Sequence, residues 1–179
     1  MTATSSNQWV DSSNKSNPEA INKAKRILKS VIYCSLSTCS QDAFPWVSPV
    51  FYAYDDKFNL YWSSAIDALH SQNINRNYGR LAIAIYNSAA EEGTGEGLYL
   101  NGGAFPLKLK EAASAFEILQ QRAGKILDRT AEDYVGDSPR RIYKFTPAEI
   151  WVTGERFPIG RQLVDTKIQI DINAIIDSL

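Results

Sequence analysis

Two neighbouring β-strands and the turn between them are predicted by one stretch of the chain, WVSPVFYAYDDKFNLYWS, at residues 46–63. Its first half, residues 46–54, is rich in aromatic and β-branched side chains, which favours a strand. The polar turn Asp55-Asp56-Lys57 leads into a second strand, residues 58–63. In that strand three apolar side chains share one face: Phe58, Leu60 and Trp62.

Segments on either side extend this sheet. Residues 32–38 alternate with a period of two and end at a turn-like Ser40-Gln41-Asp42, so the first three strands are predicted to form an antiparallel meander. Five further strands are expected at residues 81–86, 98–105, 141–145, 149–153 and 167–172.

Helices are predicted around the strands. Asn17 is a plausible N-cap and Pro18 suits the first helical position of an amphipathic helix that ends near Val31. A short helix is expected at residues 67–77, and the long apolar stripe at 109–126 indicates a helix packed on the core. The last six residues, 174–179, are compatible with a closing helical turn.

The order of these elements predicts the fold class and the domain organisation. Strands outnumber helices and arrive as hairpins, which favours a mainly β protein, an antiparallel β-barrel with peripheral helices, over a doubly wound sheet. Residues 17–179 are expected to form a single domain. Residues 1–16 are polar apart from Trp9, so we expect a flexible N-terminal arm that becomes ordered against a partner subunit.

Charge and hydrophobicity exclude several classes of partner. Nineteen basic residues nearly balance 20 acidic ones, so the surface has no net field that would attract nucleic acid or anionic lipid. The longest apolar run, residues 81–86, is far too short to span a membrane, and the first residues do not resemble a secretion signal. We therefore expect a cytoplasmic protein that binds neither nucleic acid nor membranes.

The cysteine and histidine content limits the possible chemistry. Cys34 and Cys39 are too few for a disulfide framework and lack the spacing of redox or zinc motifs, so we expect both to be reduced. His70 is the only histidine, which excludes a zinc site built from histidines and any mechanism that needs two of them. No metal site is expected.

Two segments are candidates for binding a phosphate group. The glycine-rich residues 93–97 lead into a strand rather than a helix and have the wrong glycine spacing for a dinucleotide loop, so a flexible connection is favoured. At residues 63–70 a strand that ends in two hydroxyls is followed by a helix with His70 in its first turn, an arrangement suited to an anion. Helix capping by Ser64 or Asp67 explains the same residues equally well.

Five segments together resemble the pyridoxamine 5′-phosphate oxidase-like flavin proteins, over about residues 20–153. They are residues 43–52, 60–64, 70–74, 81–86 and 98–104. The resemblance implies an FMN-binding split β-barrel that works as a homodimer, with FMN at the subunit interface.

The resemblance also implies which residues bind the cofactor. The isoalloxazine ring would lie against the second strand at Ser48, Pro49, Val50 and Phe51. Three residues would flank the ribityl phosphate, namely Trp62, Ser63 and Ser64. His70 would be the basic partner of the phosphate, at a position where many relatives have lysine, and Asn73 would add a donor one turn later.

The chain also departs from the vitamin-processing oxidases of this family. Ser48 replaces an arginine, Ala68 and Leu69 replace a basic pair, and Gly97 replaces a glutamine. Near the end of the chain, the spacing of Trp151, Arg156 and Arg161 does not match the residues that hold the substrate's phosphate in those enzymes. The sequence is therefore not that of a typical pyridoxamine 5′-phosphate oxidase.

We expect an FMN-dependent oxidoreductase that acts on a small molecule whose identity the sequence does not give. In such an enzyme the flavin carries out the hydride chemistry, so no catalytic acid or base need be visible in the sequence. The alternative is a carrier that binds flavin or haem without turnover, with His70 as the only possible histidine ligand to haem iron.

Overall fold

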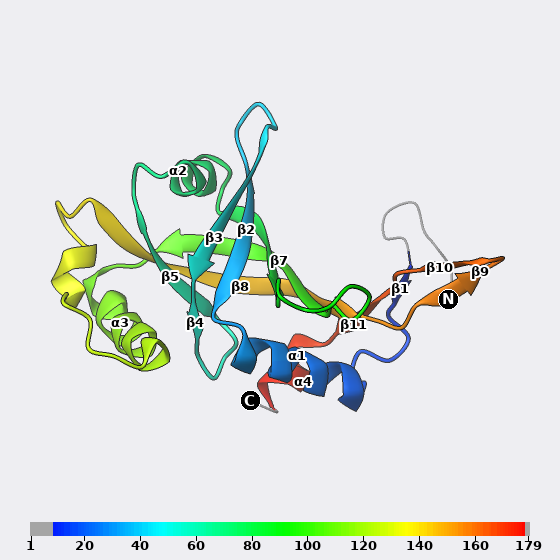
Figure 1. Cartoon of the computed structure of the whole chain (residues 1–179). Helices are drawn as coiled ribbons and strands as arrows, with labels where there is room; N and C mark the ends of the chain where they lie inside the picture. The colour runs from blue at the N-terminus through cyan, green and yellow to red at the C-terminus, as the bar shows by residue number, and fades with distance from the viewer. Residues whose placement is uncertain (1–8, 178–179) are drawn as a thin grey trace.

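The computed structural model describes residues 9–177, and in these residues most strands belong to one large, mainly antiparallel sheet. The path through the sheet is β1-β11-β8-β7-β6-β2-β3, with β4 and β5 attached beside it (Figure 1). The strands are β1 Val10–Asp11, β2 Tyr33–Cys39, β3 Pro45–Phe51, β4 Ala53–Tyr54, β5 Leu60–Ala65, β6 Arg80–Tyr86, β7 Gly97–Pro106, β8 Arg140–Thr153 and β11 Lys167–Ile170. A mainly β architecture with peripheral helices is confirmed.

Within the described residues, four α-helices and one 3₁₀ turn surround the sheet. They are α1 Pro18–Ser30, α2 Leu69–Arg76, α3 Leu109–Ala123, the 3₁₀ turn η1 Ala131–Tyr134 and α4 Ile172–Ile176. The predicted start of α1 is confirmed, because the Asn17 side chain accepts hydrogen bonds from the amides of Glu19 and Ala20, and Pro18 opens the helix. None of the helices in the described residues is long and apolar enough to span a membrane.

The long strand β8 connects the parts of the sheet. It pairs with β7 along one edge, and with β5 and then β11 along the other. The prediction of two strands at 141–145 and 149–153 was wrong. Pro147 interrupts the apolar pattern, but a register shift between Asn101 and Gly102 of β7 accommodates it within one continuous strand.

The predicted meander was correct for its first hairpin, and its second hairpin forms only through the short strand β4. β2 pairs with β3 and β4 pairs with β5, but β5 then pairs with β8 instead of β3. The break falls at Tyr52, which is fully buried and donates a hydrogen bond from its hydroxyl to the Val31 carbonyl at 2.9 Å. The two hairpins therefore lie on different parts of the sheet.

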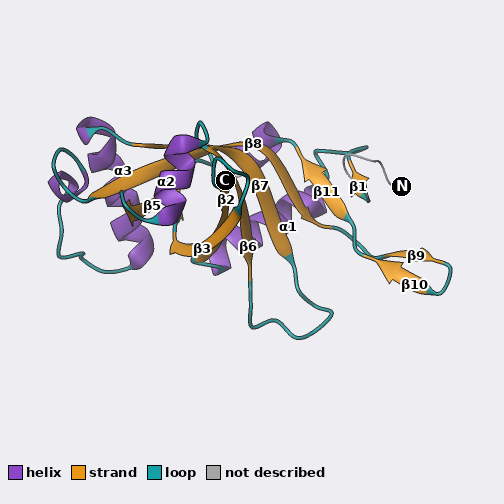
Figure 2. Ribbon diagram, turned by 90° about the horizontal axis from the view of Figure 1, so that it is seen from above, coloured by secondary structure: helices purple, strands orange, loops and turns teal. Residues whose placement is uncertain are grey.

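The hydrophobic core has two parts. The main cluster lies beneath α1 and α4 and includes the fully buried Leu28, Leu36 and Trp62. A second cluster packs α3 against β4 and β5, around Ala112 and Leu119. Figure 2 shows α1 and α3 at separate positions along the sheet, and the segment that follows α3 lies at the end near β5.

The first residues of the chain pack on their own subunit where they are described. Of the segment 1–16 that we expected to be a flexible arm, residues 1–8 lie outside the described residues. Val10–Asp11 form β1, which pairs in parallel with β11, and Trp9 stacks on Phe157 at 6.2 Å. Phe157 belongs to a hairpin that was not predicted, β9 Phe157–Ile159 with β10 Gln162–Val164, and this hairpin projects from the sheet in Figure 2.

Candidate functional site

Three of the predicted site residues meet at the beginning of α2. His70 contacts the hydroxyl oxygens of two serines through its two ring nitrogens. Its Nδ1 lies 3.1 Å from Ser48 Oγ, and its Nε2 lies 2.8 Å from Ser64 Oγ. These residues come from β3, β5 and α2, so the folding of distant segments creates the contact. We call Ser48, Ser64 and His70 the polar cluster.

The alternation of β3 explains why Ser48 faces this cluster. Trp46, Ser48 and Val50 lie on the same face of the sheet as the buried residues of β2, and Pro49 and Phe51 lie on the other face. Trp46 donates a hydrogen bond from its indole Nε1 to Ser48 Oγ at 3.0 Å. Through this contact Trp46 covers Ser48 on one side, and Trp46 itself remains 44% exposed to solvent.

His70 is half-buried, and this determines its charge. Burial disfavours the imidazolium and lowers the pKa of His70 below its ordinary value of 6.5, so the ring is mainly neutral at pH 7. A neutral ring has one donor and one acceptor nitrogen, so one serine donates to it and the other accepts from it. An arriving anion can reverse this state, because a negative charge beside the ring raises its pKa.

The first turn of α2 is not capped by a side chain. Its N-cap is Ala68, which makes no side-chain cap hydrogen bond, so the interpretation of Ser64 or Asp67 as helix caps was wrong. Ser64 contacts His70 instead, and the backbone carbonyl of Asp67 accepts a hydrogen bond from Gln72. The amides at a helix start carry partial positive charge, which adds to the ability of the polar cluster to hold an anion.

Three other predicted residues do not present their side chains at this cluster. Trp62 is fully buried and stacks on Tyr143, with ring centroids 5.7 Å apart and an interplanar angle of 8°. Asn73 is 2% exposed and donates to Thr38 Oγ1 at 3.1 Å. Val50 packs against the main core. Each of these three side chains is engaged in packing or in an internal hydrogen bond.

Ser63 and Ser64 point to opposite faces of β5, as successive strand residues must. Ser64 is buried at the polar cluster, and Ser63 is half-buried on the other side. There Ser63 Oγ accepts a hydrogen bond from Arg140 Nη2 at 3.3 Å. Arg140 opens β8 opposite Ala65, and its Nε is buried with no hydrogen-bond partner in the described structure.

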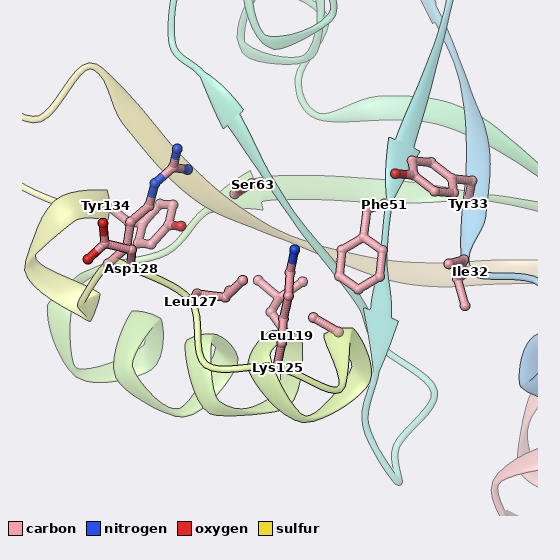
Figure 3. Close-up of a pocket in the computed structure, with 11 residues that line it drawn as sticks. Ile32, Tyr33, Phe51, Ser63, Leu119, Lys125, Leu127, Asp128 and Tyr134 are labelled. Carbon is pink, nitrogen blue, oxygen red and sulfur yellow. The ribbon is translucent and has the colours of Figure 1, made fainter.

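The face of β5 that bears Ser63 borders a cavity of about 570 Å³. Figure 3 shows Phe51, Tyr33 and Ile32 at one end and Asp128 and Tyr134 at the other, with Lys125 and Leu127 between them above α3. Pro49, also on this side of β3, is exposed. Of the predicted site residues, Ser48, Ser64 and His70 therefore meet at the polar cluster, and Phe51 and Ser63 line the cavity.

The remaining candidates from the sequence lie elsewhere. The glycine-rich loop is tied to α1, because Glu96 pairs with Arg26 at 2.6 Å and with Lys23 at 3.6 Å. Arg156 pairs with Asp165 at the base of the β9–β10 hairpin. Trp151 is half-buried and lies beside Tyr99 of β7. The described residues contain no cluster of side chains that would hold a metal ion, and both cysteines are free.

Sequence reasoning missed two groups of residues at these sites. Trp46 was detectable, since it shares the period-two face of Ser48. Arg140, and the cavity residues Lys125 and Arg129, carried no local signal because their positions depend on strand pairing and on the turn after α3.

Comparison with known proteins identifies the relationship of the chain. Residues 21–154 match the family model described as pyridoxamine 5′-phosphate oxidase. No curated protein gives a significant match.

Solved structures share the fold at low sequence identity. A haem-binding protein from Mycobacterium smegmatis superposes with a TM-score of 0.64 at 20% identity, over 88% of this chain and 60% of its own. ChuZ from Campylobacter jejuni superposes with a TM-score of 0.63 at 13% identity, over 80% of this chain and 57% of its own. General Stress Protein 26 from Bacillus anthracis superposes with a TM-score of 0.53 at 16% identity, over 80% of this chain and 96% of its own. The chain thus spans less than two thirds of the first two proteins.

Proposed function

Because the chain belongs to the pyridoxamine 5′-phosphate oxidase family, we propose that it binds FMN and acts as an FMN-dependent oxidoreductase on a small-molecule substrate. The observation that carries this proposal is the polar cluster. Ser48, Ser64 and His70 come from three separate elements and meet at the uncapped start of α2. Such a convergence of donors is what a phosphate group requires.

The polar cluster fits the phosphate of FMN by its chemistry. Two hydroxyls, an imidazole and the amides of a helix start can all donate hydrogen bonds to phosphate oxygens. Ser48 stands where the vitamin-processing oxidases have an arginine, so His70 is the one side chain of the polar cluster that can become positively charged, by taking up a proton. We therefore propose that FMN binding draws a proton onto His70.

When bound, FMN would supply the hydride chemistry, and the protein would position it and exclude water. In our proposal Ser48, Ser64 and His70 hold the phosphate, and Trp46 shields them from solvent. β3 ends the path of the sheet, so its free edge is available to the ring along residues 48–51.

We also propose that the protein is a homodimer. The open face of β2, β3 and β6 exposes Tyr33 at 57% and Val47 at 63%. Beside Val47 lies a groove of about 400 Å³ whose lining includes small side chains, among them Ser35, Ala82 and Ala84. A contiguous face that combines exposed apolar residues with small ones is typical of a surface covered by another subunit.

Haem binding without turnover is the second candidate, and one solved relative with this fold is described as a haem-binding protein. It has less support from the geometry. Both ring nitrogens of His70 contact serine hydroxyls, so an iron ligand would require one of these contacts to be given up.

The absorption spectrum of the purified protein tests the proposal. We expect a yellow protein, or a colourless one that acquires a perturbed flavin spectrum when FMN is added. A Soret band would favour the haem carrier. A protein that takes up neither ligand would contradict both functions.

A further inference from the structure

We propose that the cavity beside Ser63 binds a flat organic monoanion, an aryl carboxylate. This inference deepens the proposed function, because a ligand bound here would be the substrate of the flavin. The cavity, of about 570 Å³, lies within the range of about 300–1,000 Å³ that is usual for small-molecule sites. Phe51 and Ser63 come from β3 and β5, the strands that also provide Ser48 and Ser64 of the polar cluster.

One end of the cavity is apolar and aromatic. Tyr33 and Phe51 meet edge to face, with ring centroids 6.1 Å apart and an interplanar angle of 73°. Ile32 extends this end and remains 46% exposed, and Leu119 of α3 lies at the base. Such walls favour a flat ring, which gains both by removing apolar surface from water and by contact with aromatic faces and edges.

The other part of the cavity carries cations that are available to a ligand. Lys125 and Arg129 line it, and neither makes an ion pair in the described part of the chain. In Figure 3 the side chain of Lys125 extends from the turn after α3 into the space between Phe51 and Leu127. The position of this turn is fixed by Gly124, which adopts the left-handed conformation at φ 65° and ends the helix.

Ser63 provides a directed donor in the lining of the cavity. Its oxygen accepts a hydrogen bond from the guanidinium of Arg140, so its own proton is free to point towards a ligand. A hydroxyl that already accepts from a cation is also a stronger donor, because hydrogen bonds in a chain polarise one another.

The charges around the cavity favour an anion. Two cations, Lys125 and Arg129, line it together with one acid, Asp128, and a third cation, Arg140, reaches Ser63. The net charge is therefore positive, and the aromatic end makes a flat ring that carries a carboxylate a better match than an inorganic phosphate. The combined chemistry is that of a flat ring at the Tyr33 end and a carboxylate between Ser63 and the two cations.

The experiment uses 2-naphthoate as the probe and its neutral analogue 2-naphthamide as the ligand control. Binding to the FMN-treated protein is measured by isothermal titration calorimetry, for the native chain and for the double variant Lys125→Met/Arg129→Met. We expect naphthoate to bind more tightly than the amide, and the double variant to lose about tenfold in naphthoate affinity with no change for the amide. Lys110→Met, a lysine on the first turn of α3 outside the cavity, should behave like the native chain.

Equal binding of the two probes, no binding of either, or no effect of the double variant would overturn the inference. FMN affinity is measured on the same proteins, which separates this inference from the proposed function. Naphthoate binding that depends on Lys125 and Arg129 in a protein that takes up no FMN would support the site and contradict the flavin function. A loss of FMN affinity in the double variant, with naphthoate and FMN competing, would show instead that the cavity holds the flavin phosphate.

Discussion

The substitution His70→Ala tests the polar cluster most sharply. A hydrogen bond to a charged group contributes about 1.5–3 kcal/mol. Part of this is offset here, because His70 must release Ser48 and Ser64 and take up a proton before it can donate to a phosphate. We therefore expect a loss of about 1–2 kcal/mol of binding free energy, which makes the dissociation constant for FMN roughly fivefold to thirtyfold larger.

The assay is a titration followed by flavin fluorescence, with FMN and riboflavin compared for each protein. Riboflavin lacks the phosphate, so its affinity should hardly change in His70→Ala. Asn73→Ala is the matched control, since Asn73 lies one turn later on α2 but donates to the buried Thr38. It should lower thermal stability and leave the ratio of FMN to riboflavin affinity intact. Equal weakening of both ligands by His70→Ala, or no weakening of either, would refute a phosphate contact by His70.

Three further predictions concern pH, packing and assembly. FMN affinity should fall as pH rises from the lowered pKa of free His70 through the higher pKa that a bound phosphate gives it. The variant His70→Gln should lose this part of the pH dependence of FMN affinity. An identical pH profile for the native protein and the variant would contradict proton uptake by His70. Gly102→Ala should destabilise the fold by about 1–3 kcal/mol in chemical denaturation, because a Cβ there collides with the carbonyl of Thr146. Gly103→Ala, whose Cβ would lie at an ordinary 3.6 Å from Phe105, should cost much less, and equal losses would count against this packing. Val47→Glu should convert the proposed dimer to monomer in sedimentation velocity, with the exposed Ile126→Glu as control, and an unchanged dimer would exclude this face.

Local patterns predicted most of the elements and part of the site. Asn17 and Pro18 mark the start of α1, and the alternation around Cys34 and Leu36 marks β2, because these signals depend on neighbouring residues alone. The resemblance then pointed to Ser48, Ser64 and His70, which the structure brings together.

What the sequence could not show depends on pairing between distant segments. β5 and β8 are about 80 residues apart, and only their register places Arg140 beside Ser63. The cavity likewise requires the turn after Gly124 to fold back against β3 and β5. The resemblance assigned both Ser63 and Ser64 to one phosphate, but adjacent residues of a strand face opposite sides, so the structure places only Ser64 at the polar cluster.

The central claim is that the polar cluster binds the phosphate of FMN, and a structure of crystals soaked with FMN tests it most directly. The account predicts the phosphate at the start of α2, within hydrogen-bond distance of the His70 ring and of the Ser48 and Ser64 hydroxyls. A phosphate bound in the cavity between Ser63, Lys125 and Arg129, with the contacts of His70 to the two serines intact, would contradict it.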